Sequence, residues 1–129
     1  MDSVEFTIST SEGEYDLSAS IRLIGQDLLI AIWGGEKPHI GAVAMAQPRP
    51  SLKDPEVTSA TASVFSYVGH KEDELAKAAA EILAAALETH VVVTAGIHWD
   101  NLAPEAIQRI VRNSEILVEM ILARLVAET

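Results

Sequence analysis

The first half of the chain alternates apolar and polar residues with the two-residue period of β-strands. This pattern, rich in β-branched residues, covers 3–10 and 15–24, and the turn residues between them predict a hairpin. A short break at 25–27 makes the next strand antiparallel to the second. Three further strands are expected: "LLIAIWGG" at 28–35, "HIGAVAMA" at 39–46 and "SATASVFSY" at 59–67.

Three prolines follow the fourth predicted strand. Pro48, Pro50 and Pro55 lack an N–H donor and have a fixed φ, so they are expected to prevent regular pairing. The sequence therefore predicts a long loop over 47–57. Connections of this length without regular structure are commonly functional.

The second half of the chain has the periodicity of helices, interrupted by one apolar run. A helix is predicted at about 72–89, with acids in its first turn and an apolar stripe formed by Leu75, Ala76, Ala79, Ile82, Leu83, Ala86 and Leu87. The apolar run at 90–96 is typical of a buried central strand. A last helix is predicted from Pro104 to about 127, with an inner face of Ile107, Ile110, Val111, Leu117, Val118, Ile121, Leu122 and Leu125.

This order of elements predicts an α+β fold. We expect a single domain over 1–129, with a mixed or mainly antiparallel sheet of about six strands packed with two helices. The wide apolar band of the last helix has two interpretations. It covers the sheet, which is the default, or it meets a second subunit and forms a homodimer.

Composition and charge exclude several classes of function. The formal net charge of -10 disfavours nucleic acid and anionic membranes as partners, because both are polyanions. The apolar runs are interrupted too often for a membrane span, and the chain contains no cysteine for thiolate catalysis or thiolate metal sites. The start has acids where a secretory signal has a basic region, so we expect a cytoplasmic protein.

One segment is neutral although the chain is acidic. Residues 34–56 contain Lys37, Arg49 and Lys53, three of the nine basic residues, together with His39. Glycine-bearing breaks at 34–41, 68–73 and 96–101 each contain one histidine: His39, His70 and His98. If these breaks meet at one end of the sheet, the histidines and cations form a local basic pocket.

Two interpretations of these polar residues remain open. The cations are either solvated loop charges or an anion site, in which Arg49 grips a phosphate, Lys53 and Lys71 act as point charges and Ser51 donates a hydroxyl. The histidines are either structural, bound directly to a phosphate, or ligands of a divalent metal. Their spacing matches no known metal motif, so no metal ligand is assigned, and His90 is interpreted as structural.

Other polar and aromatic residues each have a structural and a ligand-binding interpretation. Alternation places Ser59, Thr61 and Ser63 on one strand face, either exposed to solvent or beneath a planar ligand. Trp33 and Trp99 either pack in the core or stack on an aromatic system. The sequence has no nucleophile elbow and no carboxylate pair with diagnostic spacing.

Three strings together are more specific than their parts. "KPHIGAVAMAQPRPSLKDP", "SATASVFSYVGHKED" and "VVVTAGIHWDN" resemble the LpdD-like family, the small D subunit associated with gallate and related hydroxyarylic acid decarboxylases. The resemblance covers about 34–101 at the level of motifs. It implies a prenylated-flavin chaperone that serves a UbiD-type decarboxylase, with prenylated FMN, or FMN itself, as the bound cofactor. The UbiX-type flavin prenyltransferase that makes this cofactor is a second implied partner.

The resemblance and the chemistry together give a set of expected cofactor-binding residues. The phosphate is assigned to Arg49, Lys53, His70 and Lys71, assisted by Ser51, and the rest of the cofactor to Lys37, His39, His98 and Asn101. The chain is interpreted as an accessory protein without catalytic residues. Two alternatives stay open: a purely structural subunit of the decarboxylase, and a small enzyme in which His39 or His98 acts as general acid or base.

Overall fold

The computed structural model describes residues 5–67 and 72–128. Its elements follow the expected order of five strands, a helix, a strand and a helix. They are β1 (Glu5–Ser9), β2 (Leu17–Ile24), β3 (Asp27–Gly35), β4 (Ala42–Pro50), β5 (Thr58–Ser66), α1 (Asp73–Leu87), β6 (Val91–His98) and α2 (Pro104–Glu128). The predicted α+β architecture is confirmed.

The six strands form one mixed sheet in the order β1-β2-β3-β6-β4-β5. The first three pair antiparallel, as the hairpin signals predict. β6 enters between β3 and β4, parallel to β3 from the pair Leu28–Val91 onward and antiparallel to β4. Its apolar sequence fits this central place, because a strand with neighbours on both sides is shielded from water.

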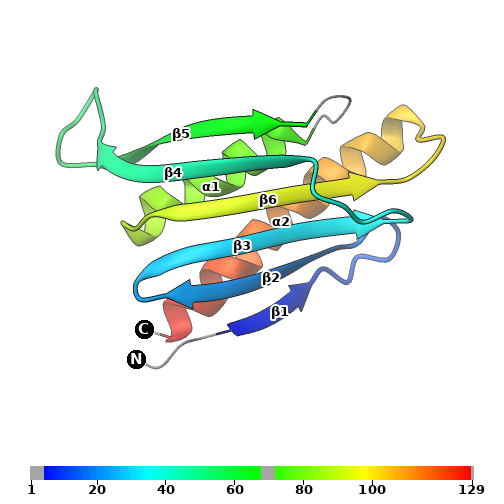
Figure 1. Ribbon diagram of the computed structural model, residues 1–129, viewed down its shortest axis with the longest axis horizontal. Helices are drawn as coiled ribbons and strands as arrows, with labels where there is room; N and C mark the ends of the chain where they lie inside the picture. The colour runs from blue at the N-terminus through cyan, green and yellow to red at the C-terminus, as the bar shows by residue number, and fades with distance from the viewer. Residues whose placement is uncertain (1–4, 68–71, 129) are drawn as a thin grey trace.

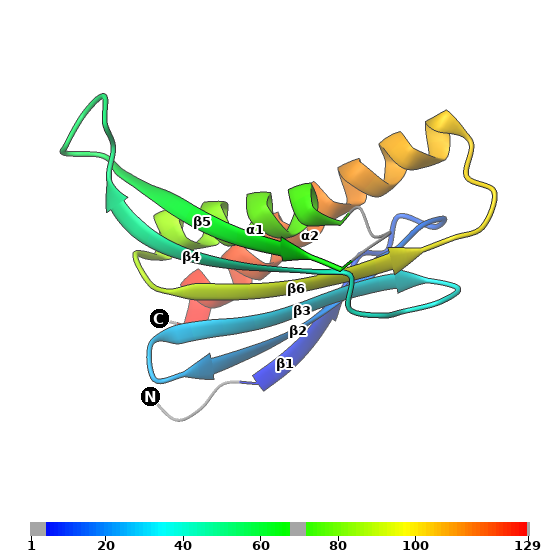
Figure 2. The ribbon, with the colours of Figure 1, turned by 45° about the horizontal axis from the view of Figure 1, so that its top comes forward.

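Both helices pack on the same face of the sheet (Figures 1 and 2). The core between the layers contains fully buried leucine, isoleucine and valine from β2, β3, β6 and both helices, and β4 contributes small residues. The default prediction for the last helix is confirmed, since Leu117 and Ile121 of α2 are fully buried. Neither described helix is long and apolar enough to cross a membrane.

The predicted inner faces of the helices are partly wrong. Ile82 of α1 is 50% exposed, and Ile107 and Val111 of α2 are exposed by 52% and 54%. Ile82 instead lines a small groove of about 270 Å³ between the two helices, next to the buried Val118. Because the helices cover different strands, their facing sides do not close on each other, and part of each apolar stripe remains in contact with solvent.

The predicted loop over 47–57 is shorter than expected. β4 continues through Pro48 and Pro50 in regular pairing with β5, as far as the pair Pro50–Thr58. The N–H of Ser51 donates to Val57, so the odd residues of β4 bond to β5 and the two prolines point to the other side. On that side β6 pairs with β4 only up to Ala46, so no ladder hydrogen bond is lost at either proline.

Candidate cofactor-binding site

The sheet face opposite the helices is not covered by any other described helix or strand, and segment 36–41 crosses it only at the end of β6, over Gly96. Its centre is apolar, because strands in the middle of the sheet have apolar residues on both faces: Leu29 in β3, Val92 in β6, and Val43 and Met45 in β4. Met45 is 62% exposed and Leu29 is 40% exposed. We call this surface, with Phe65 of β5 at its edge, the open face.

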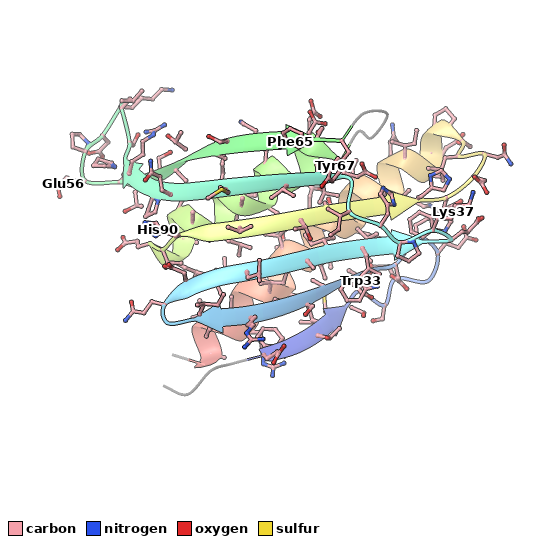
Figure 3. All side chains as sticks on the ribbon, viewed as in Figure 1. Trp33, Lys37, Glu56, Phe65, Tyr67 and His90 are labelled. Carbon is pink, nitrogen blue, oxygen red and sulfur yellow. The ribbon has the colours of Figure 1, made fainter. Side chains whose placement is uncertain are left out.

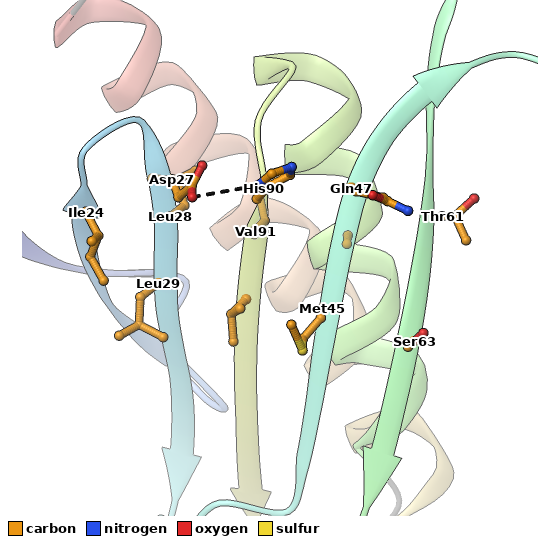
Figure 4. Close-up of a pocket in the computed structure, with 12 residues that line it drawn as sticks. Ile24, Asp27, Leu28, Leu29, Met45, Gln47, Thr61, Ser63, His90 and Val91 are labelled. Atoms are coloured by element: carbon orange, nitrogen blue, oxygen red, sulfur yellow. Dashed lines mark ion pairs between the residues drawn. The ribbon is translucent and has the colours of Figure 1, made fainter.

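One half of the open face is hollowed (Figure 4). The hollow has a volume of about 590 Å³, within the range of about 300–1,000 Å³ that is typical of ligand sites. Its floor is mainly apolar, and polar groups lie at the sides. The lining consists of Ile24, Asp27, Leu28, Leu29, Met45, Ala46, Gln47, Thr61, Ser63, His90, Val91 and Val92.

The hydroxyls of β5 border this hollow. Thr61 pairs with Gln47 and Ser63 with Met45, so both side chains stand on the open face. Arg49 donates from Nε to Oγ1 of Thr61 and from Nη1 to the carbonyl of Pro50, 3.0 Å away. These bonds use two of the five N–H donors of the guanidinium and hold it at the border of the hollow.

At another side of the hollow, His90 and Asp27 face each other. The distance from Nδ1 to Oδ2 is 3.7 Å, and both side chains are more than half exposed. Thr89 next to His90 donates its hydroxyl to the carbonyl of Gln26, which ties the start of β6 to the β2–β3 turn. An anionic ligand group would thus find a carboxylate at this side and a guanidinium at the other.

A second group of polar residues lies where β3 and β6 end. His98 donates from Nε2 to Oδ1 of Asp100 over 2.8 Å, and Nζ of Lys37 lies 3.9 Å from the same oxygen. The hydrogen bond from His98, followed by the charge of Lys37, lowers the pKa of Asp100 below its ordinary value. At this end of the sheet the carboxylate of Asp100 thus lies close to both Lys37 and His98 and offsets their positive charge.

His39 fastens the segment 36–41 across the end of the sheet. Its Nε2 lies 3.0 Å from Oε1 of Glu72, and its Nδ1 lies 2.9 Å from the carbonyl of Lys37. The same carboxylate oxygen accepts the N–H of Ile97 over 3.2 Å. Both ring nitrogens of His39 thus face acceptors within the protein, which is a structural arrangement for a histidine.

Those expected binding residues that the structure describes fall into two groups at opposite ends of the sheet, as the bounds of the strands show. Lys37, His39, His98 and Asn101 lie beyond Ala42, where β4 begins; Arg49, Ser51 and Lys53 lie where β4 ends. The eight residues from Ala42 to Arg49, separated by seven steps, span about 24 Å of extended strand. The breaks at 34–41 and 96–101 do meet, through Lys37 and Asp100, but β4 carries Arg49 and Lys53 to the other end of the sheet.

Individual residues differ in how they are held. The hydroxyl of Ser51 accepts the backbone N–H of Lys53, so it stabilises the turn at the end of β4. Lys53 is exposed in this turn. Asn101 is exposed and adopts a left-handed φ of 57°. His70 and Lys71 lie outside the described residues.

The two tryptophans have different surroundings. Trp99 packs edge to face on Tyr15, with ring centroids 5.1 Å apart, and contributes to the helix side of the core. Trp33 stands on the open face near the end with Lys37 (Figure 3). Within residues 5–67 and 72–128, no three histidine, aspartate or glutamate side chains come together as a metal site requires.

Sequence reasoning missed the apolar floor of the hollow. The available signal was in the apolar runs of β3 and β6, where Leu29 and Val92 alternate with core residues that are also apolar. A strand that is apolar on both faces predicts a second covered face. His90 was interpreted as structural because it begins a strand after a helix, and in the structure it lines the hollow.

Three comparisons relate the chain to known proteins. Residues 11–126 match the family described as the prenylated flavin chaperone LpdD-like domain. Protein LpdD of Lactiplantibacillus plantarum is 32% identical over 101 residues, which cover 71% of this chain and 64% of that protein. The chain thus spans less than two thirds of the length of this relative.

The fold also resembles a solved structure, described as the crystal structure of a novel chaperone complex for yeast 20S proteasome assembly. The similarity covers 99% of this chain and 98% of that chain, with a TM-score of 0.60 and 14% sequence identity. At this identity the comparison supports the shared fold alone.

Proposed function

Because the chain belongs to the prenylated flavin chaperone LpdD-like family, we propose that it binds prenylated FMN and assists its delivery to, or the maturation of, a UbiD-type aromatic acid decarboxylase. Membership in this family supports a chaperone role. The cofactor, its site and the enzyme that receives it are the proposal.

The hollow of the open face carries this proposal. An isoalloxazine ring is flat and largely apolar, and the floor formed by Leu29, Met45 and Val92 is apolar and built on rigid strands. Thr61 and Ser63 are small enough to allow close approach and offer hydroxyls to the polar edge of the ring. A site of this kind can bind a planar cofactor, and it needs no catalytic side chain to do so.

The phosphate of the cofactor is assigned to the end of β4. Arg49 lies at the border of the hollow through its hydrogen bond to Thr61 and has further N–H donors. Lys53, in the turn that follows, adds a second cation. The opposite side, with Asp27, is the less favourable place for an anion because like charges repel.

The openness of the hollow suits a carrier. A chaperone must release its cofactor to an enzyme, and in the single chain the hollow lies on an exposed face from which a cofactor can leave. Lys37, His39, His98 and Asn101, about 24 Å away along β4, then contact the receiving enzyme or another part of the ligand rather than the phosphate.

Anaerobic titration with FMN and with prenylated FMN, followed by absorbance and calorimetry, tests the proposal. We expect selective binding of the prenylated form, weakened in Arg49→Ala. Arg22→Ala is the matched control, because Arg22 is a half-exposed arginine in β2 that pairs with Glu5. A folded protein that binds neither flavin, with divalent metal also tested, contradicts the proposed function.

A further inference from the structure

We propose that the open face is a self-association surface on which a second copy of this chain packs face to face. The surface is unusual for a protein in solution because its large apolar side chains are exposed together. Met45 is 62% exposed, Phe65 65% and Leu29 40%, and Ile24 at the adjacent turn is 58% exposed. Exposed apolar patches of this kind mark interaction sites.

The distribution of charge favours a second copy as the occupant. Two chains of net charge -10 repel each other, so they associate best through a surface with little net charge. On the open face, Glu5 is 3.7 Å from Arg22, and Asp27 is 3.7 Å from His90. These paired charges and Arg49 lie toward the rim, and the centre is apolar, which is the usual anatomy of an interface.

The helix layer is a poorer surface for self-association. It also exposes apolar residues, including Ile82 and Val111. However, acids lie along both helices at Asp73, Glu74, Glu81, Glu105, Glu115 and Glu119, with fewer basic residues among them. Two copies meeting through this layer would bring these acids together.

The dimensions of the sheet also fit a stable dimer. Six strands about 4.8 Å apart, with about eight residues each at about 3.3 Å per residue, give a projected area on the order of 600 Å². Stable interfaces bury about 600–1,000 Å² on each partner. Two sheets stacked in this way form the two-layered packing typical of β-sandwiches, with the helices outside.

Face-to-face packing changes the candidate site. It converts the hollow from a depression on a surface into a space between two sheets, lined by both copies. The consequence for the cofactor rests on the proposed function: each flavin lies against the partner copy as well as against Leu29, Met45 and Val92. Release of the cofactor then requires opening of the dimer.

Sedimentation of the full chain without flavin tests the self-association. At micromolar concentrations we expect a species of twice the 13.8 kDa chain mass. Met45→Glu, at an exposed position in the centre of the open face, is expected to weaken the dimer about 30-fold or more, because central interface residues dominate binding. Phe65→Thr, at the edge of the face, is expected to weaken it less. Ile82→Glu, at a 50% exposed position of α1, is the matched control and should leave the dimer intact.

Circular dichroism and thermal melting check that each variant is folded. A monomeric wild type, with and without flavin, overturns the proposal. A dimer that is lost in Ile82→Glu but kept in Met45→Glu also overturns it and assigns the interface to the helices. Because the dimer is first measured without flavin, a dimer that binds no flavin contradicts the proposed function and leaves the interface standing.

Discussion

Arg49 of β4 donates a hydrogen bond to Thr61 of β5 and thereby joins a cation to the row of hydroxyls on the open face. The two residues are 12 positions apart in sequence and become neighbours because β4 pairs with β5 beyond Pro48. This contact places an anion-binding group beside an apolar hollow. It is the local arrangement that a flavin nucleotide requires, with a charged phosphate at one end and a flat ring at the other.

The first prediction concerns the two ends of the sheet. Arg49→Ala combined with Lys53→Ala should weaken binding of prenylated FMN about 10- to 100-fold, because hydrogen bonds from charged donors are lost. Calorimetry measures the affinity. The matched variant, Lys37→Ala with His98→Ala, also removes one lysine and one further site residue, but at the other end. If only this second variant loses affinity, the phosphate lies at the end of β6.

A second prediction concerns the shape of the hollow. Ser63→Phe should fill part of the space above Met45 and lower flavin affinity at least 10-fold, while the exposed position tolerates the larger side chain. Thr7→Phe, on the same face of the edge strand β1, is the control and should bind normally. Equal flavin affinities in the two variants would show that the flavin does not bind in the hollow.

Segment 36–41 crosses over β6 at Gly96, so we expect substitution of this glycine to destabilise the fold. A Cβ on Gly96 would lie 1.5 Å from the carbonyl oxygen of His39, so Gly96→Ala must displace this segment. We expect a loss of about 3 kcal/mol or more in the free energy of unfolding, measured with urea. Gly25→Ala, which meets no atom within 4 Å but has a φ of +63°, should cost only about 1 kcal/mol.

Asp16 gives a prediction of pH dependence. The hydroxyl of Thr10 and the backbone N–H groups of Glu12 and Gly13 bond to its carboxylate and lower its pKa below the ordinary value. Its contribution to stability is therefore present above the unfolded pKa of about 4 and is lost as the pH falls through the lower folded value.

Asp16→Asn should consequently lower the stability by about 1 kcal/mol at neutral pH, because hydrogen bonds to a charged acceptor are weakened. The difference from wild type should shrink as the pH falls below about 4. Thermal melting across this range provides the measurement. A difference that stays constant down to the lowest accessible pH would show that the charge of Asp16 is unimportant.

Much of the fold could be predicted because it depends on local periodicity. Each strand and helix has its own repeat of apolar residues, and the continuous apolar run of β6 also indicates its central place. The end of β4 could not be predicted. Pro48 interrupts pairing only if its nitrogen points toward a neighbouring strand that needs an N–H donor there. Whether such a strand is present depends on where β6 begins.

The candidate site was predicted less completely, because its residues meet only through the topology of the sheet. The sequence indicates that Thr61 and Ser63 share a face and that Arg49 suits a phosphate. It does not indicate that Lys37 and Arg49 lie at opposite ends. That separation follows from the direction of β4, and the hollow itself depends on β6 entering between β3 and β4.

The most direct test of the central claim is transfer of the cofactor to an apo decarboxylase of the UbiD type. The chain is loaded anaerobically with prenylated FMN, and the decarboxylase activity is followed over time against free prenylated FMN at the same concentration. We predict that the loaded chain activates the enzyme faster, and that the chain without cofactor has no effect of its own. Equal activation by free cofactor, or activation by the chain without cofactor, would contradict a role as flavin chaperone and favour that of a structural subunit.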